Sequence, residues 1–285
     1  MEIGVGHLNV IPEASGASLI DWARRADELG FSTLATIDRV VFPTYDSLVS
    51  LAAAAAVTSR IGLMTDILLG ATRNPHLLAK AAASVDQLSG GRLVLGLSAG
   101  AREEDFAATG TGFHDRGRRL DAAVELMRTA WGGEAPPPLP RPVSPRPVGG
   151  QLRLMFGGGT PASVRRAATW GIGLAISGAT PPDRAAELVA EVKEAWAAAG
   201  RDGEPRFTQL KYFAMGPDAR ERAGDYLASY YGEAARANAD RAAKNRDELR
   251  RMTGTYEAMG VHEVVFFPTI ADPDQIDMLA EAAFG

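Results

Sequence analysis

The sequence contains no cysteine among its 285 residues. This absence excludes a disulfide framework, a thiolate nucleophile, an iron–sulfur cluster and any zinc site that uses cysteine ligands. Histidine is scarce, and the four residues lack the spacing of a metal site: His7, His76, His114 and His262. We therefore expect no metal centre, so that redox chemistry here would need an organic cofactor.

Basic residues are not in excess, because 30 Lys and Arg face 35 Asp and Glu and leave a formal charge of −5. Nucleic acid and anionic lipid both require a basic surface, so neither is expected as a partner. The chain has no basic amino-terminal region followed by an apolar run, and no stretch approaches roughly 18 uncharged apolar residues. We expect a cytoplasmic protein that binds no membrane.

Glycine and proline are abundant instead, with 31 Gly and 17 Pro, so the chain turns often or brings its backbone close to a ligand. Hydrophobic residues make up 46% and charged residues 23%, which is typical of a globular protein. The length allows one large domain or two small ones.

Short β-branched or Leu-rich runs alternate with longer Ala-rich segments of helical period. The pattern predicts eight strand–helix pairs, with strands at 2–8, 33–38, 61–69, 93–98, 152–156, 172–177, 206–214 and 263–268. Because parallel strands need crossover helices and cover on both faces, eight such units favour an α/β fold of the (β/α)8 TIM barrel type, as one domain with insertions. An open doubly wound sheet is the rival, but its G-x-G-x-x-G fingerprint is absent from 6–12.

Two segments interrupt this rhythm. The first, at about 132–150, holds seven prolines and predicts an ordered excursion between the fourth helix and the fifth strand, with a domain linker as the alternative. The second is the charged run at about 217–260, which is too long for one crossover and predicts two or three helices.

The most informative block is TSRIGLMTDILLGATRNPHLLAKAAASVDQLSGGRLVLGLSAG at 58–100, followed by REEDF at 102–106 and RGRRLD at 116–121. Weaker blocks are ADELGFSTL at 26–34, FGGGTPASVRRAATWGIGLAIS at 156–177 and AMGVHEVVFFPT near the carboxyl end. In order and spacing these blocks resemble the luciferase-like monooxygenases, the bacterial luciferase superfamily of flavin- and deazaflavin-dependent oxidoreductases, over nearly the whole chain.

The resemblance implies a barrel that binds FMN, or alternatively the deazaflavin coenzyme F-420, at the carboxyl ends of the strands. It also implies a small organic substrate, a homodimer, and a separate flavin reductase as a source of reduced cofactor. The barrel fold by itself places chemistry at the same end of the strands.

Residues 156–163 end a predicted strand and open a helix with three consecutive glycines. Free backbone N–H groups at a helix amino terminus suit a phosphate, although a tight turn with a Thr cap gives the same pattern. The resemblance assigns the cofactor phosphate to this turn. The expected contacts are Gly157, Gly158, Gly159, Thr160 and Ser163.

The ends of the third and fourth strands are expected beside the cofactor ring. The resemblance places the ring or its tail against Ser98, Ala99 and Gly100, which otherwise simply end a packed strand. Thr65 and Asp66 are candidates for hydrogen bonds to the polar edge of the ring, and strand alternation lets only one of them face inward. Asp66 is equally explained as the ion-pair partner of an arginine such as Arg73.

Asp38 and Arg39 follow the second strand, where many members of the family carry a His used in the reaction. A guanidinium stays protonated and cannot act as a base, but it can hold an anionic substrate or a reduced-flavin anion. We assign Arg39 a catalytic role and Asp38 a substrate contact, with a local ion pair as the alternative. The departure at Arg39 casts doubt on a luciferase-type reaction.

His7 ends the first strand near the expected barrel mouth, so it is the acid/base candidate, with a capping or structural role as the alternative. His114 is a candidate ligand contact after the fourth strand. Arg116 or Arg119 can reach the phosphate, unless they form a solvated helix face. The loop after the second strand offers two aromatic residues as an apolar substrate wall or as core, Phe42 and Tyr45.

The leading hypothesis is a flavin-dependent oxidoreductase in which reduced FMN delivers a hydride to an organic substrate or electrons to O2 for monooxygenation. Hydride transfer with F-420 on the same scaffold is the alternative. A barrel that binds or stores flavin without catalysis is a third hypothesis, because the His at the second strand is missing. A metal-dependent or cofactor-free hydrolase would need clustered carboxylates or histidines at strand ends, which the sequence does not show.

Overall fold

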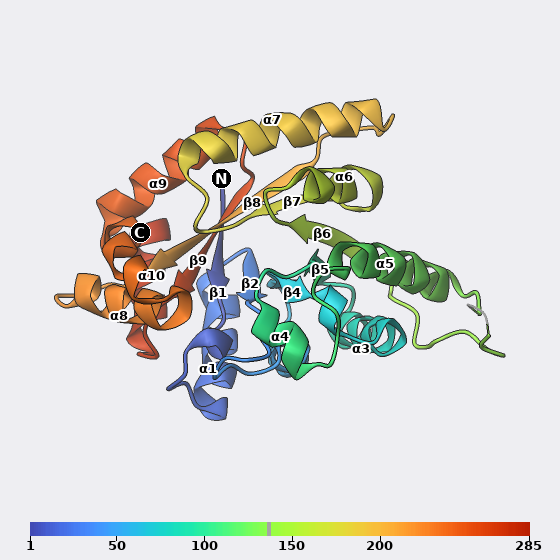
Figure 1. Ribbon diagram of the computed structural model, residues 1–285. Helices are drawn as coiled ribbons and strands as arrows, with labels where there is room; N and C mark the ends of the chain where they lie inside the picture. Colours follow the sequence, from blue (N-terminus) through green and yellow to red (C-terminus); the bar gives the residue numbers. More distant parts are fainter. Residues whose placement is uncertain (136–137) are drawn as a thin grey trace.

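Parallel strands form the centre of the molecule and helices surround them (Figure 1). The computed structural model describes residues 1–135 and 138–285. Its strands are β1 (Glu2–Gly6), β2 (Thr33–Thr36), β3 (Gly62–Thr65), β4 (Leu68–Leu69), β5 (Leu93–Ser98), β6 (Arg153–Gly157), β7 (Gly173–Ile176), β8 (Arg206–Phe213) and β9 (Glu263–Pro268).

The α-helices are α1 (Gly16–Leu29), α2 (Ser47–Val57), α3 (Pro75–Leu88), α4 (Glu103–Ala108), α5 (Arg116–Gly132), α6 (Pro161–Trp170), α7 (Pro182–Ala198), α8 (Ala219–Tyr231), α9 (Arg246–Ala258) and α10 (Asp274–Phe284). Three 3-10 segments accompany them: η1 (Leu8–Val10), η2 (Gly70–Thr72) and η3 (Glu233–Arg241). Within the residues that the structure describes, no helix is long and apolar enough to cross a membrane.

The sheet closes into a barrel. Neighbouring strands run parallel in the order β3-β2-β1-β9-β8-β7-β6-β5, and the ring is closed by pairing between β3 and β5 at Leu63 with Leu93 and Met64 with Val94. The short β4 continues the third unit and pairs with the end of β5. The predicted (β/α)8 barrel is therefore confirmed.

β1 and β2 each end two residues before the predicted position. After β1, His7 takes the amino-cap position of η1, where its Nδ1 accepts a hydrogen bond from Leu8 N. After β2, the Ile37 carbonyl leaves the ladder and accepts hydrogen bonds from the side chains of Asn9 and Ser47. Side-chain donors thus replace strand pairing at both ends.

The third predicted strand, 61–69, is wrong as one continuous element. It is divided into β3 and β4 by Asp66 and Ile67, and both of these residues line a cavity. Met64 and Thr65 still pair in register with Ala35 and Thr36 of β2. The pairing therefore stops where the chain begins to form a cavity wall.

Residues between α5 and β6 pack along α3. Lys80 Nζ donates to Ser144 O at 2.6 Å, and Val148 N donates to Asp86 Oδ2 at 2.8 Å. Pro136 and Pro137 belong to the predicted proline-rich excursion and lie outside the described residues. Further along, the charged run at 217–260 forms α8, η3 and α9, which confirms the prediction of two or three helices.

Candidate active site

A cavity of about 670 Å3 opens at the carboxyl ends of the strands. Its walls come from the segments after β2, β3, β5, β6 and β7, together with the first turns of α5 and α6 and the end of α8. Loops at this end can vary without disturbing the barrel, which is why barrel proteins build their sites there.

The predicted phosphate turn forms part of this wall, and all five of its assigned residues line the cavity: Gly157, Gly158, Gly159, Thr160 and Ser163. We call residues 157–160 the glycine cradle. A Cβ on Gly157 would lie 2.4 Å from Ile67 Cδ1, and Gly158 has a φ of +122°. Both positions therefore favour glycine for steric reasons.

Thr160 and Ser163 form a capping box at the start of α6. Thr160 N donates to Ser163 Oγ at 2.9 Å, and Ser163 N donates to Thr160 Oγ1 at 3.3 Å. Because the two hydroxyls are engaged with the helix terminus, an anion at the cradle would rely mainly on backbone N–H groups and the helix dipole.

Two arginines line the cavity together with the glycine cradle: Arg116 and Arg166. Arg166 is buried and pairs with Asp121, with 2.5 Å between Nε and Oδ1. Arg116 Nε donates to Gly100 O at 3.0 Å, and its guanidinium lies 3.9 Å from the Phe113 ring centroid. Within the described residues no carboxylate pairs with Arg116, so its positive charge is available to a ligand.

Ser98, Ala99 and Gly100 continue the same wall from the end of β5. Of the two candidates on the third strand, Asp66 lines the cavity, whereas Thr65 is fully buried and donates to Gly96 O at 2.7 Å. Burial, and to a lesser extent the charge of Glu263, raise the pKa of Asp66 to about 7. One oxygen of this carboxyl, Oδ2, is buried without a hydrogen-bond partner.

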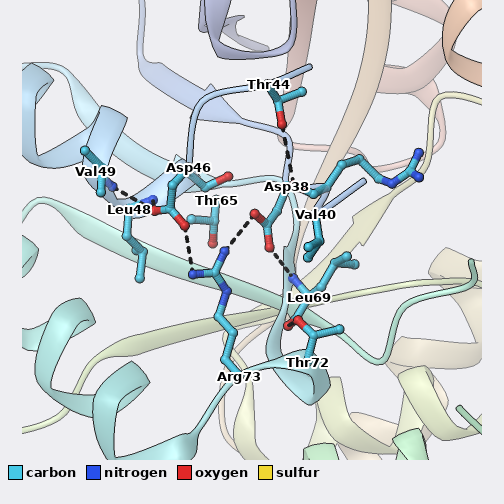
Figure 2. Close-up of polar contacts among 12 residues, drawn as sticks. Asp38, Val40, Thr44, Asp46, Leu48, Val49, Thr65, Leu69, Thr72 and Arg73 are labelled. Atoms are coloured by element: carbon cyan, nitrogen blue, oxygen red, sulfur yellow. Dashed lines mark hydrogen bonds and ion pairs between the residues drawn. The ribbon is translucent and has the colours of Figure 1, made fainter. Parts of the chain in front are cut away.

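Asp66 does not pair with Arg73, although such an ion pair was the alternative explanation of Asp66 from the sequence. Arg73 instead bridges two other carboxylates: its Nη2 donates to Asp38 Oδ1 and its Nη1 to Asp46 Oδ2, both at 2.9 Å (Figure 2). Leu69 N donates to the second oxygen of Asp38. Burial raises the pKa of Asp38, and the charge of Arg73 opposes that rise.

Asp38 lines the cavity as predicted for a substrate contact, yet its two oxygens are held by Arg73 and Leu69. Asp46 also caps α2 by accepting hydrogen bonds from Leu48 and Val49 (Figure 2). The cluster therefore ties the loop after β2 to the segment after β4 and to the start of α2.

Arg39 lines the cavity through a side chain that is only 5% exposed. Its Nε lies 2.7 Å from Asp105 Oδ2, and its Nη2 lies 3.0 Å from Glu104 Oε1. Asp105 Oδ1 accepts hydrogen bonds from the backbone N–H groups of Val40 and Val41. Arg39 is thus the anchor of a buried ion pair between the loop after β2 and α4.

His7 is buried and lies outside the cavity walls. Its Nδ1 accepts the hydrogen bond from Leu8 N, and burial lowers its pKa to about 3. Its imidazole is therefore neutral at physiological pH and serves as a helix cap, which corresponds to the structural alternative.

The cavity lining does not include three of the predicted substrate contacts. Phe42 packs edge-on against Tyr230 with 5.0 Å between ring centroids. Tyr45 is 42% exposed, and its hydroxyl donates to Ala14 O. His114 is exposed beside Phe113, outside the cavity.

Sequence reasoning missed Arg102, Tyr230 and Tyr231, which also line the cavity. Arg102 Nη2 donates to Tyr230 O at 2.6 Å, and its guanidinium lies 5.0 Å from the Tyr230 ring centroid. Arg102 directly follows the small residues at the end of β5, so its position in a strand-end loop was a signal. The two tyrosines lie in a distant helix with no local signal.

These features define a (β/α)8 barrel whose cavity carries a glycine cradle, a buried carboxyl group and arginines. The model of the family described as luciferase-like monooxygenase matches residues 1–277. The chain belongs to this family and has a luciferase-like oxidoreductase fold.

An uncharacterized protein of Mycobacterium tuberculosis (strain ATCC 25618 / H37Rv) is 33% identical over an alignment of 177 residues, and the match covers 59% of this chain and 61% of that protein. The match thus spans about three fifths of the length of this curated relative.

Two solved structures share the fold over 99% of this chain. Monooxygenase RslO1 from Streptomyces bottropensis has a TM-score of 0.81, 22% identity and 98% of its own chain covered. An F420-dependent secondary alcohol dehydrogenase in complex with an F420-acetone adduct has a TM-score of 0.81, 18% identity and 97% of its chain covered. At these identities the likeness shows the fold alone.

Proposed function

We propose that this protein is an oxidoreductase that binds reduced FMN in the cavity at the strand ends and acts there on a small organic substrate. The observation that carries the proposal is the glycine cradle, which opens the amino terminus of α6 into a cavity of about 670 Å3. A terminal phosphate is stabilised at such a helix end, and the volume falls in the usual range for cofactor sites.

The residues present fit such a cofactor. The backbone N–H groups of Gly158 and Gly159 and the guanidinium of Arg116 would hold its phosphate, since these residues line the cavity and no carboxylate pairs with Arg116 in the described residues. Ser98, Ala99 and Gly100 would support the ring, because small side chains leave a smooth wall.

The bound flavin supplies the redox chemistry, either hydride transfer or electrons for O2. The chain's own contribution is control of protons and charge. With a pKa of about 7, the Asp66 carboxyl can hold a proton in the cavity or release one near neutral pH. We assign the proton-holding role to Asp66 in place of His7, and we assign Arg39 to fixing the cavity wall.

A charge placed in the cradle tests the proposal. Gly159 has ordinary backbone geometry, and a Cβ there would meet nothing closer than Leu188 Cδ1 at 3.7 Å. In Gly159→Asp we expect FMN affinity to fall by about tenfold or more, because a carboxylate repels the phosphate. Gly159→Asn has the same shape without the charge and should cost much less.

Riboflavin provides the matched ligand control because it has no phosphate. Both variants should bind riboflavin about as well as the wild-type protein does. Fluorescence titration measures all the affinities. Equal losses for FMN and riboflavin would contradict a phosphate in the cradle, and failure of the wild-type protein to bind FMN at micromolar concentration would overturn the proposal.

F-420 is a second candidate cofactor. Arg102 lines the cavity without a carboxylate partner in the described residues, and it could pair with the additional negative charge of the F-420 tail. The shared fold with an F420-dependent dehydrogenase adds support. Parallel titrations with FMN and F-420 decide between them, because the true cofactor should bind more tightly by at least about tenfold and Arg102→Gln should weaken only F-420.

A further inference from the structure

Lys211 differs from every other lysine of the chain. The sequence has only four lysines, and three of them have oxygen partners: Lys80 bonds to a backbone carbonyl, Lys193 pairs with Glu204, and Lys244 pairs with Glu248. Lys211 lies on β8 and is only 7% exposed. No carboxylate pairs with it in the described residues, and its Nζ lies 4.8 Å from the centroid of the Tyr256 ring.

The Lys211 side chain lines a pocket of about 190 Å3 between the ends of β7 and β8, the end of α8 and η3. Arg241 and Asn238 of η3 line the same pocket, and no acidic residue does. In the described residues Arg241 makes no ion pair either. A buried lysine, an exposed arginine and an asparagine therefore line one small pocket, and none of its described lining residues is acidic.

This arrangement leaves an electrostatic imbalance. Burial and the nearby charge of Arg241 lower the pKa of Lys211 to about 8. A buried charge is normally paired, so the unpaired ammonium of Lys211 at this pocket indicates that its partner is a ligand, and the exposed guanidinium of Arg241 lies at the same pocket to share it. The other titratable groups in contact are the phenols of Tyr212, Tyr231 and Tyr256, which are neutral at pH 7.

We propose that the pocket lined by Lys211, Arg241 and Asn238 is a second anion-binding site, which takes an oxyanion such as a phosphate group. Tyr231 lines both this pocket and the large cavity, so the two spaces are neighbours. The anion can therefore be a free ion or the charged end of an organic molecule whose body occupies the large cavity. The site does not depend on which cofactor the large cavity binds.

Carbamylation by cyanate tests the site residue by residue. Cyanate is small and reacts with neutral amines, and peptide mass spectrometry reports the rate at each lysine separately. Inorganic phosphate should slow the reaction of Lys211 by about fivefold or more, with half-protection on the order of 1 mM, because the anion covers the amine and favours its protonated form. Lys80 and Lys193 should react at unchanged rates, and chloride at equal ionic strength should protect none.

Variants and calorimetry complete the test. Arg241→Gln should weaken the protection of Lys211 about tenfold through loss of a charged hydrogen-bond donor, whereas Arg250→Gln on exposed α9 should leave it unchanged. If Lys211 is inert to cyanate, titration calorimetry with phosphate decides, because Lys211→Met should have one binding site fewer than the wild-type protein. An equal number of sites, or unprotected Lys211, would overturn the proposal.

Phenyl phosphate distinguishes the two sources of the anion. If it protects Lys211 at lower concentration than inorganic phosphate, the anion is the end of an organic ligand; if only inorganic phosphate protects, it is a free ion. Gly159→Asp tests whether binding at the cradle produces the protection. This variant disrupts the cradle, and we expect the protection of Lys211 to stay intact in it. Loss of protection in that variant would contradict a separate site.

Discussion

The ends of β5 and β6 face the same cavity as the ends of β2 and β3, but they contribute opposite kinds of residue. At the ends of β5 and β6 themselves the wall is made of small residues, Ser98–Gly100 and the glycine cradle, so the backbone itself lines the cavity there, and the arginines of this side come from further along the chain. On the β2–β3 side the wall is made of charged groups, and most of these are already engaged in ion pairs.

The comparison separates two ways of building a site. Backbone N–H groups at a helix end need only a turn that keeps side chains away, and neighbouring residues in the sequence provide it. Buried charges need partners, and these partners lie far away in the sequence. Asp38 pairs with Arg73, as Figure 2 shows, and Arg39 pairs with Asp105. Substitutions on the charged side should therefore affect stability, and those on the small-residue side should affect ligand binding.

The largest expected effect on stability is that of Asp105→Ala. Its carboxylate accepts hydrogen bonds from Arg39 Nε and from the N–H groups of Val40 and Val41, so removal leaves a buried guanidinium with only half-exposed Glu104. We expect the free energy of unfolding to fall by about 3 kcal/mol, measured by urea denaturation.

Two controls sharpen this result. Ser98→Ala on the opposite wall should change stability by less than about 0.5 kcal/mol, and so should Glu103→Ala, which removes an exposed carboxylate from the same helix. A loss in Ser98→Ala as large as that in Asp105→Ala would remove the distinction between the two walls.

Asp66 is the exception on the charged side, because no described residue forms an ion pair with it. Its folded pKa of about 7 is above the ordinary value of 3.8, so the folded protein binds this proton more tightly than the unfolded chain does. Stability from this group is fully present below about pH 4 and is lost as the pH rises to about 7. Asp66→Asn should therefore be more stable than the wild-type protein by a few kcal/mol at pH 8, since each pKa unit corresponds to about 1.4 kcal/mol, and nearly equal to it at pH 4.

Denaturation curves at the two pH values measure the effect, with Asp202→Asn at an exposed position as the control. A constant difference between Asp66→Asn and the wild-type protein across this pH range would mean that Asp66 is ionised in the folded state. Its carboxylate would then be charged in the folded protein, like the ion-paired groups on the same side of the cavity.

The smallest effect is expected at His114. The side chain is exposed and lies outside the cavity, so His114→Ala should change neither FMN affinity nor the free energy of unfolding by more than about 0.5 kcal/mol. Fluorescence titration and denaturation provide the two numbers. A clear loss of FMN affinity would return His114 to the binding site.

The sequence predicted the barrel and the small-residue wall because both depend on local patterns. Alternating periods indicate strands and helices, and Gly157–Gly159 before Thr160 and Pro161 indicate a turn into a helix amino terminus. The sequence predicted side-chain roles less well where a role depends on neighbours that only the fold brings close. His7 stands at a strand end, but it turns away to cap η1.

The sequence by itself determined the eight-unit barrel and the position of the cradle, since short-range periodicity and turn chemistry fix them. It also carried the resemblance to the luciferase-like family, through the order and spacing of its sequence blocks. Only the tertiary structure decided that Arg73 pairs with Asp38 and Asp46, that Asp66 lines the cavity with no ion-pair partner in the described part of the chain, and that Lys211 lines a pocket whose described residues include no acid. The physical reason is that the ionisation and pairing of a buried charge depend on the groups folded around it, and those groups are far away in the chain.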